Sequence, residues 1–225
     1  MRRAKEAVII KERRGRPARF DDRHHEVLQT AARIFSDLGY RYATLDNVAG
    51  ALDMTRPALY YYAKSKEELL SKCFKVASDK LAQALAEAEL GRTGLECLSR
   101  FFRSYLDFIC DSFGKCFALT DRREMPSEEK ERTRLLQLAL ARSIEAMIVK
   151  GMIDGSIRQC DPADVARLFF AAFNGVPRWY KIGQSRSSGQ VADAFLDILI
   201  VGIAGHAGAP SHSAARGRRP SLKRN

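Results

Sequence analysis

The chain has 225 residues, of which 46% are hydrophobic and 29% are charged, and its formal net charge is +11 at pH 7. This apolar content is enough for a real core and is typical of soluble proteins. No apolar run approaches the ~18 residues of a membrane-spanning helix, and the basic start MRRAKEAVIIKERR lacks the long apolar stretch of a signal peptide. The sequence therefore predicts a cytoplasmic protein with no membrane partner.

The cysteines are odd in number and scattered, and they form no CxxC pair: Cys73, Cys97, Cys110, Cys116 and Cys160. This pattern favours reduced thiols in a core over a disulfide framework or a metal site. We therefore expect neither a metal nor a cofactor.

The excess positive charge lies at the two ends of the chain. Residues 1–20 contain eight Lys or Arg and two Glu, and residues 206–225 contain five Lys or Arg and no acid, which leaves 25 of each sign elsewhere. We expect residues 1–20 and 207–225 to form disordered basic arms. Such arms bind polyanions by releasing counterions, and without an amphipathic apolar face they favour nucleic acid over a membrane surface.

The N-terminal arm contains RRGRP, with Arg14 and Arg16 on either side of a glycine. Arginines in this arrangement fit a narrow, A·T-rich minor groove, where the negative potential is enhanced. The core of this segment resembles the AT-hook motif, and a plain solvated arm is the simpler alternative.

Residues 21–85 show the start and stop signals of four helices. The first helix follows Asp21 and Asp22, carries an apolar stripe at helical spacing, and ends at Gly39. Hydroxyl residues that suit an N-cap begin the next three, with Thr44 before a short second helix, Thr55 before a third over about 56–62, and Ser65 before a fourth over 66–89. Asp53 falls at the turn between the second and third helices, where a left-handed conformation is often required.

Two short helices joined by a tight turn and packed on a longer one form a helix-turn-helix, whose second member places its N-terminal residues against base edges in the major groove. The third helix is therefore expected to read DNA, with Leu59 as its anchor in the core. Its three adjacent tyrosines, Tyr60, Tyr61 and Tyr62, cannot all face one core, because neighbours on a helix point about 100° apart. The alternative is that all three pack against the first and fourth helices.

Residues 22–70 resemble the DNA-binding domain of TetR-family repressors, through AARIFSDLGYRYATLDNVAGALDMTRPALYYYAKSKEELL and, within it, T-x-x-x-L-Y-Y-Y-x-x-x-K-E-E-L. The resemblance implies a homodimer on a double-stranded DNA operator. It implies phosphate contacts from Thr44, Thr55, Tyr61 and Lys66, and base-edge or groove contacts from Arg56, Pro57, Ala58, Tyr60 and Tyr62. Lys66 also adds charge beside a helix N-terminus, where phosphates bind readily.

The chain departs from the usual pattern of that family at three positions. Asp53 stands where the family usually has Gly, Ala63 where it has Phe or Val, and Tyr62 where it commonly has His. The first two departures alter packing and leave the fold intact. The third puts in doubt any operator sequence inferred from relatives.

Residues 90–206 are predicted to be helical, without strand-like alternation, so the expected fold is all-α with two domains, 21–85 and 90–206. Helical stretches are expected over 95–119, over 128–153 with an end at Gly151, from Pro162 after an Asp161 cap, and over about 189–204. The motifs of nucleotide-binding, metalloprotease and serine-hydrolase sites are absent from this region. An enzyme is therefore not expected.

The same family resemblance implies a ligand cavity in the second domain and a four-helix dimer interface made by its last two helices. Residues 155–181 resemble a subgroup that senses acyl-CoA thioesters. In this chain cations such as Arg178 would meet phosphates, Trp179 would stack on a purine, and phenylalanines would line an acyl slot; a merely solvated basic rim is the alternative. The candidate ligand residues are Phe102, Phe113, Phe169, Phe173, Asn174, Arg178 and Trp179.

These patterns together predict a transcriptional repressor that a small apolar or acyl-CoA-like effector releases from a palindromic operator. An effector of either kind is compatible with the residues. The alternative function is that of an architectural DNA-binding protein, driven by the basic arms without any effector.

Overall fold

The computed structural model describes residues 22–181, 183 and 185–203, and these residues form helices without a β-strand element. The first helix covers 22–38, and the later elements are α2 (Leu45–Ala51), α3 (Arg56–Leu59), α4 (Lys66–Glu89), α5 (Gly94–Cys110), α6 (Ser112–Leu119), α7 (Ser127–Asp154), α8 (Pro162–Asn174), the 3-10 helix η1 (Val176–Arg178) and α9 (Ser188–Ile203). The all-α prediction is confirmed. The two basic arms, with Arg14 and Arg16, lie outside the described residues.

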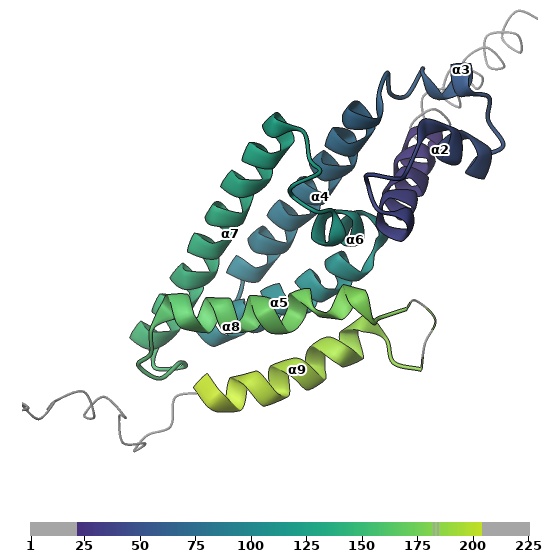
Figure 1. Ribbon diagram of the computed structural model, residues 1–225. Helices are drawn as coiled ribbons and strands as arrows, with labels where there is room; N and C mark the ends of the chain where they lie inside the picture. Colours follow the sequence, from purple (N-terminus) through teal and green to yellow (C-terminus); the bar gives the residue numbers. More distant parts are fainter. Residues whose placement is uncertain (1–21, 182, 184, 204–225) are drawn as a thin grey trace, which may run out of the picture.

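The helices divide into a small N-terminal unit and a larger bundle (Figure 1). The first helix, α2 and α3 lie together near the start of α4, and α4 runs from this unit into the bundle. Within the bundle α5 is the central helix and packs against α4, α6, α7, α8 and α9. Its burial on most sides follows from its sequence, because apolar residues occupy most of its positions from Cys97 to Cys110.

The predicted hydroxyl caps begin the helices of the N-terminal unit. Each side chain accepts a hydrogen bond from the backbone N–H group three residues later: Thr44 from Asn47 at 3.2 Å, Thr55 from Ala58 at 3.4 Å and Ser65 from Glu68 at 3.1 Å. These bonds satisfy N–H groups that have no partner inside the helix. As a result α4 spans the predicted residues, 66–89.

The turns of this unit use the left-handed backbone conformation at the predicted positions. Gly39 has a φ of 80° and ends the first helix, and Asp53 has a φ of 51° between α2 and α3. Aspartate is one of the few residues other than glycine that tolerates this conformation. The chain therefore makes the tight turn although it lacks the glycine usual in the family that it resembles.

The third helix is shorter than predicted. It ends at Leu59, and residues 60–62 form turns rather than a continued helix. The carbonyl of Leu59 accepts hydrogen bonds from the N–H groups of Tyr62 at 2.9 Å and of Ala63 at 3.2 Å, which closes the helix and redirects the chain toward α4. Leu59 and Ala63 are both buried, so the core anchor is confirmed.

The apolar stretch 95–119 forms two helices because Asp111 interrupts it. Asp111 is extended, with a φ of −77° and a ψ of 173°, and its carboxylate accepts the Gly114 N–H bond at 2.7 Å as the cap of α6. Lys80 of α4 also binds this carboxylate. At Gly114 a Cβ atom would lie 1.9 Å from the Phe108 carbonyl oxygen, so the sharp change of direction requires glycine.

The prediction that the next helix ends at Gly151 is wrong. α7 continues to Asp154, and Gly155, with a φ of 80°, ends it. Gly151 has a packing role instead, because a Cβ atom there would lie 2.5 Å from the Ile157 side chain. The backbone of Gly94 approaches from the other side, where an added Cβ would lie 2.0 Å from the Gly151 nitrogen.

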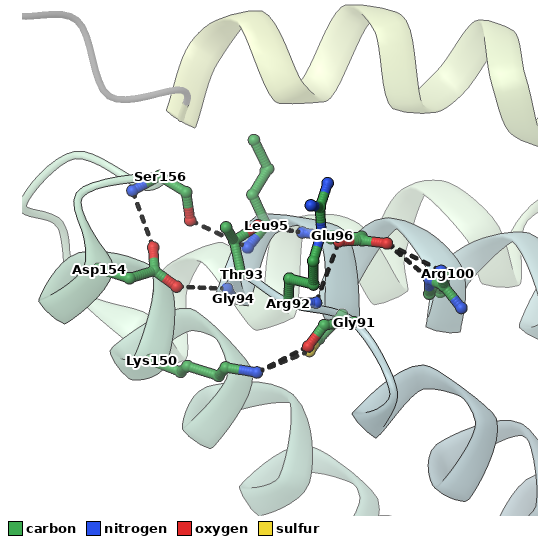
Figure 2. A network of polar contacts seen from close by, with 11 residues as sticks. Gly91, Arg92, Thr93, Gly94, Leu95, Glu96, Arg100, Lys150, Asp154 and Ser156 are labelled. Carbon is green, nitrogen blue, oxygen red and sulfur yellow. Dashed lines mark hydrogen bonds and ion pairs between the residues drawn. The ribbon is translucent and has the colours of Figure 1, made fainter.

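The turn between α4 and α5 is fastened to the end of α7, as Figure 2 shows. The Asp154 carboxylate accepts hydrogen bonds from the N–H groups of Gly94 at 2.7 Å and of Ser156 at 2.9 Å. The Lys150 ammonium donates to the Gly91 carbonyl at 2.9 Å. The C-terminal end of α4 is thus held in place relative to α7.

Candidate nucleic-acid interface and ligand pocket

α3 presents most of the predicted DNA-contacting side chains to solvent. Thr55, Arg56 and Pro57 are exposed, and Ala58 is half-buried. Tyr61 is the most open large side chain of this segment, with 86% of its surface exposed, and Tyr60 has 43% exposed. Thr44 is exposed at the cap of the preceding helix. These positions form one accessible surface at the N-terminal unit.

Arg56 links α2 and α3 across this surface. Its Nε donates to the Tyr60 hydroxyl at 3.2 Å, and its guanidinium lies 3.3 Å from the Asp46 carboxylate. The guanidinium carbon is also 5.9 Å from the centroid of the Tyr60 ring. The side chain therefore has a fixed direction, although it remains more than half exposed.

The three adjacent tyrosines have three different environments. Tyr61 faces solvent, Tyr60 contacts Arg56, and Tyr62 is half-buried with its ring 5.9 Å from that of His24 on the first helix. The alternative in which all three pack inside is excluded by the exposure of Tyr61. Tyr62 belongs partly to the core of the N-terminal unit.

The ammonium group of Lys66 is occupied inside the protein. Its Nζ donates to the carbonyls of Tyr40 at 2.8 Å, Ala43 at 3.0 Å and Arg41 at 3.3 Å. It also lies 4.4 Å from the centroid of the Tyr40 ring. An ammonium has three N–H donors, so these carbonyls account for all of them. Lys66 fastens the start of α4 to the turn after the first helix.

A cavity of about 570 Å³ lies in the bundle between α5, the end of α6, the loop 120–126, α7, α8 and η1. Its wall combines apolar side chains, such as Leu140 and Phe170, with cations and other polar groups. Two of the predicted ligand residues, Asn174 and Arg178, belong to the wall. The Tyr105 hydroxyl donates to the Asn174 amide oxygen at 2.6 Å, and burial raises the pKa of Tyr105.

Three predicted ligand residues lie behind the cavity and are absent from its wall. Phe102, Phe169 and Phe173 are fully buried, and the ring of Phe102 lies 4.9 Å from each of the other two. Phe170 contacts the same cluster at 5.4 Å from Phe102 and borders the cavity. The aromatic cluster therefore supports the wall, and two of its rings, those of Phe170 and Tyr105, border the cavity.

The two remaining predicted ligand residues are also outside the cavity wall. Trp179 is half exposed beyond the end of α8. Phe113 lies where α6 meets the N-terminal unit, with its ring 5.4 Å from the His25 ring and 5.2 Å from the Lys80 ammonium. Phe113 therefore joins the bundle to the first helix.

Several wall residues were not predicted, among them Tyr105, Arg122, Thr133 and Phe170. A helical repeat could have found Phe170, because it lies four residues before Asn174 and shares its face. Thr133 lies in a run dominated by charged residues, EEKERTR, so nothing in its local pattern marks it as buried.

The loop 120–126 touches both parts of the molecule. Thr120, Arg122 and Met125 border the cavity, while the Glu124 carboxylate accepts a hydrogen bond from the Arg41 backbone N–H at 3.2 Å. Arg41 belongs to the turn that Lys66 fastens to α4. One short segment thus connects the cavity wall with the N-terminal unit.

The described part of the chain contains neither a metal-binding cluster nor a membrane-spanning helix. Over residues 22–181 and 185–203, no three His, Cys, Asp or Glu side chains are grouped as the ligands of a metal ion would be. No helix in the same ranges combines the length and hydropathy needed to cross a bilayer.

Comparisons with known proteins agree on one family. Residues 27–73 match the family described as "Bacterial regulatory proteins, tetR family", and residues 91–203 match "Tetracyclin repressor-like, C-terminal domain". The chain is 25% identical over 195 residues to the HTH-type transcriptional repressor KstR2 of Mycolicibacterium smegmatis, covering 83% of this chain and 93% of the relative.

Solved structures show the same fold. The ketosteroid transcriptional regulator KstR2 of Mycobacterium tuberculosis superimposes with a TM-score of 0.76 at 21% identity, over 82% of this chain and 96% of that one. AibR in complex with isovaleryl coenzyme A and operator DNA superimposes with a TM-score of 0.69 at 21% identity, over 79% and 98% of the two chains. With both of its parts matched, the chain belongs to the TetR family of DNA-binding transcriptional regulators, which are not enzymes.

Proposed function

We propose that this protein is a cytoplasmic, homodimeric transcriptional repressor, and that a small effector bound in the cavity releases it from a palindromic operator. The observation that carries the proposal is the loop 120–126, which borders a cavity of about 570 Å³ and also contacts the turn at Arg41. A ligand that moves this loop acts directly on the N-terminal unit. Of the relatives named above, one is a transcriptional repressor and another a ketosteroid transcriptional regulator, which supports the proposed class of function.

On DNA, the exposed surface of α3 is proposed to enter the major groove. Arg56, Pro57, Ala58 and Tyr60 would contact base edges or the groove wall, and Tyr62 would do so only at the edge of its half-buried ring. Phosphate contacts are proposed for Thr44, Thr55 and Tyr61. At Lys66 the phosphate would meet the free backbone N–H at the start of α4, because the ammonium already binds three carbonyls.

The effector is proposed to be a mainly apolar molecule with an anionic end. Leu140, Phe117 and Phe170 provide apolar wall, and Arg122 and Arg178 provide two cations at the same cavity. An acyl-CoA has this combination of an acyl chain and phosphates, and AibR was solved with isovaleryl coenzyme A. A free fatty acid or another small amphiphile also combines an apolar chain with an anionic end, in a smaller molecule.

The release follows from linkage between two binding sites. If the effector prefers a conformer whose two reading helices are wrongly spaced for adjacent half-sites, it lowers operator affinity by the same factor by which DNA lowers effector affinity. Both half-sites must be bound at once, so a small change in spacing is enough.

The test begins with selection of a preferred site from random duplexes. Fluorescence anisotropy at physiological salt would then compare that site with a scrambled duplex. A repressor is expected to bind its site at least about 10³-fold more tightly, and isovaleryl coenzyme A or a medium-chain fatty acid should reduce that affinity. Equal affinity for both duplexes would instead favour the architectural alternative. An Arg178→Ala variant should keep operator affinity and lose part of the response to the anionic effector.

A further inference from the structure

A second cavity, of about 240 Å³, lies between α4 and α7 beside the first one. Phe117 and Thr133 border both cavities, so these two side chains form the partition between them. On the α4 side the second cavity is bordered by Ser71 and Phe74, and on the α7 side by Glu129. The two spaces are therefore neighbouring compartments.

The partition contains a buried hydroxyl without a hydrogen-bond partner. Thr133 is only 2% exposed, and no group in the described structure bonds its Oγ1. A threonine or serine in a helix can bond the carbonyl four residues earlier, as Ser143 does on the same helix at 3.2 Å and Thr120 does after α6 at 2.6 Å. A buried polar group without a partner is destabilising. A ligand group that enters the cavity and bonds the Thr133 hydroxyl would remove this cost.

One turn earlier on α7, a buried carboxylate borders the same compartment. Glu129 is 5% exposed, and its Oε2 accepts a hydrogen bond from the Ser71 hydroxyl of α4 at 2.6 Å. Within the described ranges Glu129 forms no ion pair, although surface acids nearby on the same helix do, such as Glu128 with Arg132. Its second oxygen is therefore available to a donor.

Most charged side chains around the compartment are already paired with one another or with neighbouring side chains. Besides Glu129, the charged wall residues are Lys75, Asp79 and Arg132, which gives two acids and two bases. Lys75 pairs with Asp79 at 3.1 Å. Arg132 pairs with Glu128 outside the wall, so Glu129 is the wall carboxylate that has no ion pair in the described structure. A ligand hydroxyl would find an acceptor in Glu129 and a donor in Thr133.

We propose that the effector site extends past Thr133 into the compartment between α4 and α7, and that a hydroxyl group of the effector binds there. This hydroxyl donates to the Glu129 carboxylate and accepts from the Thr133 hydroxyl. The inference rests on the proposed function, because it assigns a hydroxyl-bearing molecule to the same effector cavity.

Binding in this compartment would act on α4. The Ser71–Glu129 bond is the one side-chain hydrogen bond between α4 and α7 in the described structure, so a ligand hydroxyl on the same carboxylate would be linked through it to α4. The other end of α4 stays attached to α7 through residues 91–94 (Figure 2). A ligand that moves Glu129 would therefore act, through Ser71, on the end of α4 that carries the N-terminal unit.

The test uses saturated medium-chain fatty acids and their ω-hydroxy counterparts as probes, from octanoic to dodecanoic acid. Isothermal titration calorimetry on the full chain would give the affinity gain caused by the hydroxyl for each chain length. At the best length the gain should be about tenfold, as expected for a buried hydrogen bond to a charged group. Thr133→Val keeps the shape of the side chain and should abolish most of that gain, and Glu129→Gln should reduce it.

Thr120→Val is the matched control. Thr120 is also buried at the first cavity, but its hydroxyl already donates to the Cys116 carbonyl at 2.6 Å. This variant should keep the hydroxyl gain, whereas Thr133→Val should lose it without a lower melting temperature, because its hydroxyl has no partner to lose. A lower melting temperature for Thr133→Val, or a gain that survives in it, would overturn the inference.

The outcomes also separate this inference from the proposed function. If plain and hydroxylated acids bind equally well, the hydroxyl subsite is wrong and the effector cavity remains. If no acid of either series binds, the subsite and a fatty-acid effector are both wrong, and the response to isovaleryl coenzyme A tests the proposed function separately.

Discussion

Lys66 holds two segments of the N-terminal unit together. Its ammonium binds three backbone carbonyls of the turn 40–43 and lies over the Tyr40 ring. Hydrogen bonds to a charged group contribute more than neutral ones, and a buried carbonyl left without a donor costs additional free energy. The residue therefore connects the stability of the fold to the position of α3 on DNA.

Replacement of this ammonium tests its role. Lys66→Met keeps the methylene stem and should lower the free energy of unfolding by about 2–3 kcal/mol, measured by urea denaturation followed by circular dichroism. Lys64→Met, at an exposed position two residues earlier, is the control and should change stability little. If Lys66→Met were as stable as the parent chain but bound operator poorly, the ammonium would belong to the phosphate contact after all.

Arg56 is the residue whose loss should change sequence preference. Its guanidinium is oriented by Asp46 and Tyr60 and remains exposed on α3. Arg56→Ala should therefore lose about 1–3 kcal/mol of discrimination at one base pair of each half-site. Anisotropy titrations over operators with single substitutions would measure this. A uniform loss of affinity across all operator sequences would indicate that Arg56 contacts phosphates and not a base.

Two glycines within helices differ in their surroundings, so their replacement by alanine should have opposite effects on stability. A Cβ atom on Gly151 would lie 2.5 Å from Ile157, in the contact that brings α7 against α5 and the following turn. Gly50 in α2 has no heavy atom within 4 Å of the position of such a Cβ. The same substitution therefore introduces a clash at one site and only improves helix propensity at the other.

The paired substitutions give a direct comparison of stability. Gly151→Ala should lower the free energy of unfolding by about 1–3 kcal/mol because the core is overpacked. Gly50→Ala should raise it by about 0.5–1 kcal/mol, since alanine loses less backbone entropy in a helix. Thermal unfolding of both variants under one set of conditions would show the two signs. A stabilising Gly151→Ala would mean that α5 and α7 separate more easily than their packing indicates.

For the whole molecule, α8 and α9 carry apolar side chains that the single chain leaves uncovered. Leu168 on α8, and Ile198 and Val201 on α9, are exposed, with Ile198 at 75%. Pairing these helices with their copies in a second chain would remove this surface from water, which supports the proposed four-helix dimer interface.

A single charge on this surface should prevent the pairing. Ile198→Glu is expected to give a monomer by size-exclusion chromatography with light scattering, and to weaken operator binding because two half-sites are no longer bound together. Ile153→Glu is the matched control, since Ile153 is equally apolar and 82% exposed but lies on α7. If Ile198→Glu stays dimeric while Ile153→Glu dissociates, the interface involves the end of α7 instead.

The sequence alone was sufficient for what depends on neighbouring residues. The caps Thr44, Thr55 and Ser65, the turn at Asp53 and the span of α4 follow from local hydrogen bonds and from helical periodicity. The reading motif and the family were also predictable, because their residues form one continuous segment.

Only the tertiary structure decided which groups are free and which are already paired. The phosphate role predicted for the Lys66 side chain conflicts with carbonyls more than 20 residues away in sequence. The cavity is bordered by Phe170 and not by Phe169 or Phe173, because those two rings are fully buried against Phe102 on another helix. Thr133 lies in a charged run of the sequence, yet it is buried where α7 meets α4 and α6. Local patterns determine where helices begin and end, whereas the environment of a side chain depends on contacts between segments that are distant in sequence.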